Sequence, residues 1–133
     1  MRQLFILLAA IFLSSCFESP EELDVSGPVP SDTTIVVGGT LTLKVYAHCG
    51  GPCGTFYYQW KKDGVDLVDG GTDHNSSMYG SAGPELVLTN IQQADSGSYT
   101  CLVNYPEIPD TKLSDVSHLR VNAPPVSAKK AHR

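Results

Sequence analysis

Apolar and polar residues alternate in short runs along most of this chain, and turn-forming residues separate the runs. In TLTLKVYAHC, residues 40–49, every second side chain is apolar or a cysteine, which places these side chains on one face of an extended strand. The alternation returns in TFYYQWKK at residues 55–62 and in SYTCLVNY at residues 98–105, whereas no long run repeats every 3.6 residues. The pattern therefore predicts an all-β domain of short strands over residues 33–122.

The two ends of the chain lack this alternation. Residues 4–13 form an apolar run behind a charged start; the run is too short to span a bilayer as a helix and indicates the core of a signal peptide. Residues 16–32 are acidic and contain three prolines, which predicts an extended tether. Residues 123–133 are expected to form a flexible basic tail.

A longer motif lies near the end of the alternating region. Leu88 precedes the run Asp95-x-Gly97-x-Tyr99-x-Cys101, and Trp60 stands upstream before a Lys-Asp-Gly turn. Together these residues resemble the signature of immunoglobulin-like (I-set/V-set-like) domains, which implies a two-sheet β-sandwich with Greek-key connections. The resemblance implies seven signature positions in the core: Val45, Trp60, Leu88, Asp95, Gly97, Tyr99 and Cys101.

The resemblance also implies roles for several of these residues. Trp60 fills the space between the sheets, and the hydroxyl of Tyr99 bonds the backbone at the corner before its strand. Asp95 accepts backbone N–H groups in the same corner. In this family a basic residue often pairs with that aspartate, but residues 72–84 contain no lysine or arginine, so we do not expect this ion pair.

Which cysteines pair depends on the strand register. The family usually joins Cys101 to a cysteine on the second strand; the preceding residues put Val45 at that position, whereas counting back eleven residues from Trp60 puts Cys49 there. The two registers differ by four residues, about 13 Å along a strand, and a disulfide requires Cα atoms within about 7 Å. We favour a bridge between Cys49 and Cys53 with Cys101 a buried free thiol, and a Cys49–Cys101 bridge is the alternative.

The fourth cysteine, Cys16, has a different context. The sequence Leu13-Ser14-Ser15-Cys16 follows the apolar leader and resembles the lipobox of bacterial lipoproteins. The resemblance implies cleavage of residues 1–15, acylation of Cys16, and a chain held by its lipid at a bacterial cell envelope. Phe17 is not an aspartate, which implies the outer membrane, on either face. A plain secretory signal cut near Ser15 is the alternative.

Charge narrows the choice of partners. The formal net charge is −5, and loss of residues 1–15 would make it −6, which argues against nucleic acid as a partner. The acidic residues between 63 and 73 lack the tight spacing of a calcium loop, so they are expected to form a solvated surface.

The remaining candidate chemistry is sparse. His48 with Cys49 and Cys53 does not make up four metal ligands, so we expect a disulfide rather than a metal site. There is no G-x-S-x-G elbow, and neither His74 nor His118 has an evident nucleophile partner. We therefore expect neither an enzyme nor a cofactor.

These observations favour a lipid-anchored envelope module for adhesion, recognition or scaffolding. Its partners would be the membrane, through the lipid, and a protein or glycan that the sequence does not identify. The loop between the last two strands, with Tyr105, Pro106, Ile108 and Pro109, is the candidate contact surface beside the CGGPCGT loop, unless it is merely a long ordered loop. An edge strand that adds to a partner's sheet is another route. The alternatives are a periplasm-facing structural or envelope-assembly lipoprotein and an accessory subunit of an enzyme system.

Overall fold

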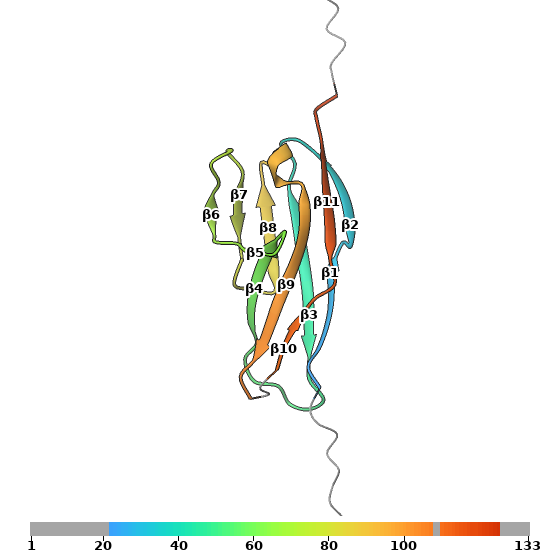
Figure 1. The fold of residues 1–133 in the computed structure, drawn as a ribbon, viewed down its shortest axis with the longest axis vertical. Helices are drawn as coiled ribbons and strands as arrows, with labels where there is room; N and C mark the ends of the chain where they lie inside the picture. The colour runs from blue at the N-terminus through green and yellow to red at the C-terminus, as the bar shows by residue number, and fades with distance from the viewer. Residues whose placement is uncertain (1–21, 108–109, 126–133) are drawn as a thin grey trace, which may run out of the picture.

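The computed structural model describes residues 22–107 and 110–125, and within them two β-sheets pack face to face (Figure 1). The first sheet has the order β1-β3-β8-β7-β6; the second has the order β2-β11-β9-β4-β5, with β10 also paired to β9. The predicted all-β sandwich with Greek-key connections is confirmed. In chain order the elements are β1 (Asp24–Val29), β2 (Asp32–Val36), β3 (Leu41–His48), β4 (Tyr57–Lys62), β5 (Val65–Asp66), β6 (Gly70–Gly71), β7 (Ser77–Tyr79), β8 (Glu85–Thr89), the 3-10 turn η1 (Gln93–Asp95), β9 (Gly97–Tyr105), β10 (Asp110–Leu113) and β11 (Ser117–Asn122).

The core follows the alternation read from the sequence. Alternate residues of β3, β8, β9 and β11 are buried between the sheets, and the intervening residues point outward. Trp60 lies opposite Cys101 on the neighbouring strand, and both side chains are fully buried. The indole N–H of Trp60 donates to the carbonyl oxygen of Gly83 at 2.8 Å, so its polar atom is satisfied inside the core. Of the seven signature positions, Val45, Trp60, Leu88, Asp95, Tyr99 and Cys101 are buried, and Gly97 is half-buried.

The domain begins earlier than the sequence predicts. β1 occupies residues that we assigned to the tether of residues 16–32, so that assignment is wrong from Asp24 onward. β1 pairs antiparallel with β3, and Leu23 and Val25 are buried in the core. The chain then crosses to the other sheet, where β2 runs parallel to β11. Two prolines and a short alternation hid the strand from sequence reasoning, because proline at a sheet edge is tolerated but reads as a loop signal.

The two ends of the domain lie far apart along its long axis (Figure 1). β1 starts beside the end of β3, where Asp24 pairs with His48, and the ammonium group of Lys112 bonds the carbonyl oxygen of Leu23 at 3.3 Å. The start of the domain therefore shares one end of the sandwich with the β3–β4 loop and the β9–β10 hairpin. At the opposite end, the last residue of β11, Asn122, pairs with Val36.

Candidate functional site

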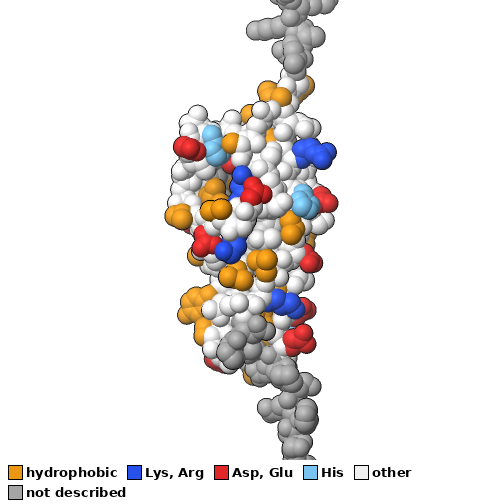
Figure 2. All heavy atoms as spheres, viewed as in Figure 1, with side chains coloured by type: hydrophobic (Ala, Val, Ile, Leu, Met, Phe, Trp, Pro, Cys, Tyr) orange, Lys and Arg blue, Asp and Glu red, His pale blue; other side chains and the backbone are white. Residues whose placement is uncertain are grey.

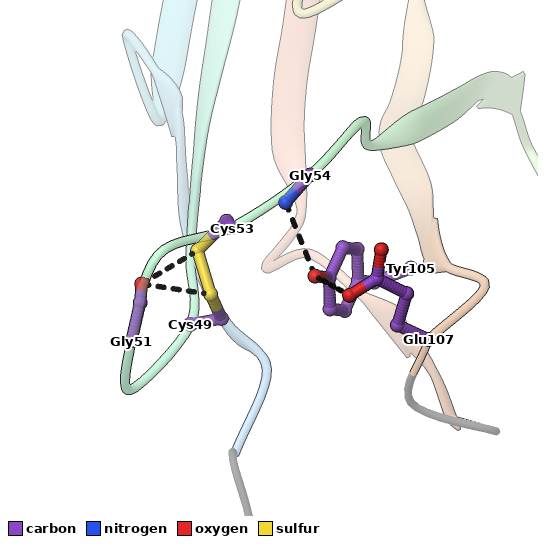
Figure 3. The surroundings of a disulfide bond; sticks show 6 residues. All are labelled: Cys49, Gly51, Cys53, Gly54, Tyr105 and Glu107. Atoms are coloured by element: carbon purple, nitrogen blue, oxygen red, sulfur yellow. Dashed lines mark hydrogen bonds between the residues drawn. A yellow bond between two sulfur atoms is a disulfide. The ribbon is translucent and has the colours of Figure 1, made fainter.

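The β3–β4 loop carries the disulfide (Figure 3). Cys49 and Cys53 are bonded, with their Cα atoms 6.0 Å apart, so the pairing that we favoured is confirmed. The carbonyl oxygen of Gly51 lies 3.2 and 3.3 Å from the two sulfur atoms. In the chain-entropy account, closing so short a loop contributes about 2 kcal/mol to folding.

Cys101 is a free thiol in the core, as we expected for that pairing. Burial raises its pKa to about 12. A thiol in this state is mostly protonated at neutral pH, and the thiolate is the reactive form. Cys101 therefore acts as a small apolar side chain.

Tyr105 is not the contact residue that the sequence predicts. Its side chain is 1% exposed, and its ring packs against Phe56 with a centroid distance of 5.3 Å. Its hydroxyl donates to the Glu107 carboxylate at 2.7 Å and accepts the Gly54 N–H at 3.1 Å (Figure 3). The ring thus joins the β3–β4 loop to the β9–β10 hairpin, because an aromatic residue at the end of a strand is drawn into the core. Pro106 is exposed.

Ile108 and Pro109, the other two residues of the predicted contact loop, lie outside the described residues. The β3–β4 loop and the described part of the β9–β10 hairpin are therefore held to each other mainly by contacts within the domain. These contacts give little reason to regard this end of the domain as the binding surface.

A polar cluster closes the opposite end, around Asp95. The hydroxyl of Tyr99 donates to the carbonyl oxygen of Asp95 at 2.6 Å, which is the corner contact that the resemblance implies. The Asp95 carboxylate is 2% exposed, and it accepts the Gln92 N–H at 2.7 Å and the Ser76 hydroxyl at 2.9 Å. Its Oδ1 also lies 2.9 Å from Nε2 of His74.

His74 thus occupies the place of the basic partner that we did not expect. Sequence reasoning missed it because we searched that segment for lysine and arginine alone; a histidine there was the available signal. The other ring nitrogen, Nδ1, lies 2.9 Å from the Asp73 carboxylate. Only a doubly protonated ring can donate to both carboxylates.

A third feature is the outer face of the second sheet. Residues directly opposite each other on paired strands share a face. Since Trp60 and Cys101 point inward, their neighbours Gln59 and Leu102 point outward, opposite each other. Leu113 of β10 continues this row on the other side of Leu102.

Val68 extends the same row past β4. The register of β4 with β5 continues beyond Asp66, because the Leu67 N–H donates to the Trp60 carbonyl oxygen at 2.9 Å. The next residue, Val68, therefore comes opposite Gln59. We call Val68, Gln59, Leu102 and Leu113 the apolar row. Figure 2 shows this face, with hydrophobic side chains across its middle and charged side chains between them.

The two ends of the apolar row are open to solvent, and Gln59 and Leu102 between them are half-buried. Val68 is 79% exposed and Leu113 is 52% exposed, and Tyr57, in the next row, is 58% exposed. Single exposed apolar residues are normal, but several on one sheet face are typical of an interaction surface, and here Gln59 separates Val68 from Leu102 and Leu113.

Comparison with known proteins places the chain in a family. The family described as "Immunoglobulin domain" matches residues 28–104. The chain belongs to this family. As an immunoglobulin domain it resembles the human protein Peroxidasin homolog, with 34% identity over 110 residues that make up 81% of this chain and 7% of that protein. Immunoglobulin domains are typical of adhesion and recognition modules in cell-surface proteins.

Solved structures show the same fold. Extracellular domains 3–5 of Drosophila OTK match with a TM-score of 0.57 and 24% identity, over 80% of this chain and 37% of that one. The eight N-terminal domains of the Down Syndrome Cell Adhesion Molecule match with a TM-score of 0.57 and 16% identity, over 77% of this chain and 12% of that one. The immunoglobulin domain therefore spans a minor part of each of these relatives.

This immunoglobulin domain has one contact that resembles a catalytic pair. The Ser98 hydroxyl lies 3.1 Å from Nδ1 of His118, but Asp32 accepts the backbone N–H of His118 rather than a ring N–H. The carboxylate does not orient the imidazole, so the three residues do not form a nucleophilic relay. Across residues 22–107 and 110–125, no three His, Cys, Asp or Glu side chains come together as metal ligands. No helix in that part of the chain has the length and hydropathy of a membrane span.

The His74–Asp95 contact predicts a pH dependence of stability. The hydrogen bond to Asp95 raises the pKa of His74 above its ordinary value of 6.5, against a smaller opposing effect of burial. A raised pKa means that the protonated ring stabilises the fold; this contribution is complete below pH 6.5 and is lost as the pH rises through the folded-state pKa. The side chain is 32% exposed, so we expect a loss of about 1 kcal/mol or less.

Urea denaturation at pH 5.5 and at pH 8.5 measures this loss, and His74→Gln is the matched control. The unsubstituted domain should be more stable at pH 5.5 than at pH 8.5, and the substitution should reduce that difference. An unchanged difference in the variant would mean that another group is responsible.

Proposed function

We propose that this immunoglobulin domain is a lipid-anchored binding module of a bacterial cell envelope. In this proposal the lipid on Cys16 holds the chain at the membrane, and the module acts in adhesion, recognition or scaffolding. The observation that carries the binding role is the exposed apolar row on the outer face of β4, β9 and β10, because such a group on a folded domain favours contact with a partner.

The geometry of the N-terminal end supports contact through the sheet face rather than through the loops. β1 begins at Asp24, eight residues after Cys16, and eight residues span at most about 28 Å. The β3–β4 loop and the β9–β10 hairpin lie at the end of the domain where β1 starts (Figure 1). An anchor at Cys16 would therefore hold these loops toward the membrane and leave the sheet faces open at the sides.

The anchor is tested by comparing the full chain with its Cys16→Ala variant in a bacterial host. We expect the full chain to sediment with membranes and to incorporate radiolabelled palmitate, and the variant to lose both properties. Cys101→Ala is the matched control, because it changes a cysteine that the structure buries. Equal fractionation of the Cys16→Ala variant and the full chain would support plain secretion instead.

Protease treatment of intact cells then tests the display of the domain. Loss of the domain while a periplasmic marker survives would support adhesion or recognition outside the cell. Survival of both until the envelope is permeabilised would favour a periplasm-facing structural or envelope-assembly role. Co-purification with an enzyme would favour the accessory role.

A further inference from the structure

We propose that a polar groove over β2, β11 and the start of β9 binds a hexuronate, a sugar that carries one carboxylate, within a glycan. The proposal names a ligand class for the proposed binding module. It rests on that function only for the binding role, because the groove does not involve the anchor. Three features carry it: the shape of the groove, an arginine without an acidic partner, and the order of donors and acceptors along the groove.

The groove lies on the outer face of the second sheet and has a volume of about 590 Å³. This volume falls within the range of about 300 to 1,000 Å³ that is typical of small-molecule sites. The residues of its lining that concern the ligand are Asp32, Thr34, Gly97, Ser98, His118 and Arg120. We call this feature the β2–β11 groove. Gly97 contributes backbone alone to the lining, which leaves room for a ligand between the side chains on either side of it.

Arg120 supplies a cation that the domain itself does not use. The four lysines that the structure describes each have an acidic partner, in the pairs Lys44–Glu85, Lys61–Asp66, Lys62–Asp63 and Lys112–Asp24. Within the same part of the chain, the Arg120 side chain makes no ion pair or hydrogen bond, and it is exposed in the groove. A guanidinium binds a carboxylate through two parallel hydrogen bonds, so Arg120 is available to a carboxylate from outside.

The strand register places polar groups around Arg120. The parallel pairing of β2 with β11 brings Thr34 beside Arg120 and Asp32 beside His118, and Ser98 lies on the other side of His118. Nδ1 of His118 lies 3.1 Å from the Ser98 hydroxyl, whereas Nε2 has no bond to the residues that the structure describes. Asp32 and Thr34 are separated by two positions, about 7 Å along a strand. The β2–β11 groove therefore offers the donors of Arg120 at one point and the Asp32 carboxylate a short distance along it.

This order of groups favours a sugar acid over a simple anion. The Asp32 carboxylate repels acetate, which has no proton to donate, but it accepts hydrogen bonds from sugar hydroxyls. A hexuronate brings both kinds of group, since its carboxylate accepts from Arg120 while its hydroxyls donate to Asp32. The formal net charge of −5 disfavours a polyanion, so the glycan carries its carboxylates singly.

The position of the groove suits a ligand beyond the membrane. β2 and β11 lie side by side in the half of the domain away from the N-terminal end (Figure 1). An anchor at Cys16 would therefore leave the β2–β11 groove open to glycans of the surroundings.

Saturation-transfer NMR of the full chain, solubilised in a detergent without a sugar headgroup, tests the proposal. The probe is methyl β-D-glucuronide, and we expect saturable binding. Methyl β-D-glucoside is the matched probe, because it has a hydroxymethyl group in place of the carboxylate. Its dissociation constant should be at least about tenfold higher, since it lacks the charge-assisted hydrogen bonds to Arg120. Absence of saturable binding of the glucuronide, or equal binding of the two probes, would overturn the proposal.

Arg120→Gln locates the binding in the groove. This substitution should raise the dissociation constant of the glucuronide by at least about tenfold. Lys44→Gln is the matched control, because it removes the same charge from an exposed position on the other sheet, where Lys44 pairs with Glu85. It should leave the constant unchanged. Equal effects of the two substitutions would mean that the overall charge of the chain governs binding, and would overturn the proposal.

Asp32→Ala separates a sugar acid from a simple anion. The variant should fold, because the backbone N–H of His118 keeps its bond to the Ser31 carbonyl oxygen at 2.9 Å. We expect weaker binding of the glucuronide, since its hydroxyls lose their acceptor, and tighter binding of acetate, since a repulsive charge is removed. Asp32→Asn keeps one acceptor oxygen and should weaken glucuronide binding less. Tighter binding of both probes by Asp32→Ala would show that the carboxylate alone is recognised, and the sugar class would be wrong.

The Cys16→Ala variant keeps this proposal distinct from the proposed function. If Cys16→Ala fractionates like the full chain but the glucuronide binds through Arg120, the anchor fails and the groove remains a binding site. If the chain is anchored and Arg120→Gln has no effect on the glucuronide, the groove fails and the anchor remains.

Discussion

An Asp95→Ala variant is expected to lose about 3 to 5 kcal/mol of unfolding free energy, the typical cost of removing one partner from a buried charged cluster. The Asp95 carboxylate is almost fully buried and accepts the Gln92 N–H, the Ser76 hydroxyl and the His74 ring N–H. Removal of the carboxylate leaves these donors without their acceptor. Buried donors without partners are costly, because the unfolded chain satisfies them with water.

Urea denaturation of Asp95→Ala measures this loss, and Asp73→Ala is the matched control. The Asp73 side chain is 99% exposed and also bonds His74, so its removal should cost no more than about 0.5 kcal/mol. A similar small effect for both substitutions would mean that the cluster around Asp95 contributes little to stability.

A Trp60→Ala variant is expected to be destabilised by about 3 to 5 kcal/mol or to fail to fold, because the substitution removes the largest buried side chain of the core. The cavity lies between the two sheets, and the carbonyl oxygen of Gly83 loses its indole donor. Far-UV circular dichroism during urea denaturation gives the stability of the variant, since the chain has no other tryptophan for fluorescence.

Trp60→Phe keeps the measurement informative if the alanine variant does not fold. Phenylalanine leaves a smaller cavity and should cost less than alanine. Tyr57→Ala is the matched control: it removes an aromatic ring from the same strand, but the ring is 58% exposed, so the loss should be small. A loss for Tyr57→Ala as large as that for Trp60→Phe would contradict the assignment of Trp60 to the centre of the core.

The sequence predicts the inner layer of this domain well because burial imposes a period of two on each strand. Leu43, Leu86 and Val103 face the core as their alternation requires. The regular spacing of residues along a strand also restricted which cysteines can pair. A shift of four residues along β3 moves a cysteine beyond the reach of Cys101.

Sequence reasoning failed where a contact joins distant segments through a single side chain. The contact between His74 and Asp95 spans 21 positions; the motif around Asp95 implies a basic partner in residues 72–84 but does not say that a histidine takes that place. Tyr105 was assigned to the surface because its neighbours Pro106 and Glu107 belong to a loop, whereas its own ring continues the inward face of β9. β1 was missed because its pairing with β3 overrides the loop preference of Pro28 within it and of Pro30 just after it.

The apolar row was equally invisible from the sequence. Val68, Leu102 and Leu113 lie in three segments of the chain, and only the register of β4, β9 and β10 aligns them. A face made by cross-strand neighbours requires the pairing to be known, which a single sequence does not give.

The parallel pairing of β2 with β11 also determines how the domain carries mechanical load. β2 follows the first strand from the N-terminal end and β11 is the last strand, and five residue pairs join them from His118 and Asp32 to Asn122 and Val36. If the N-terminal end is fixed and the C-terminal end is pulled along the long axis, the two strands are drawn past each other. Their hydrogen bonds are then sheared together rather than opened one after another. The domain is therefore built to resist tension along its length better than a force that peels away one edge.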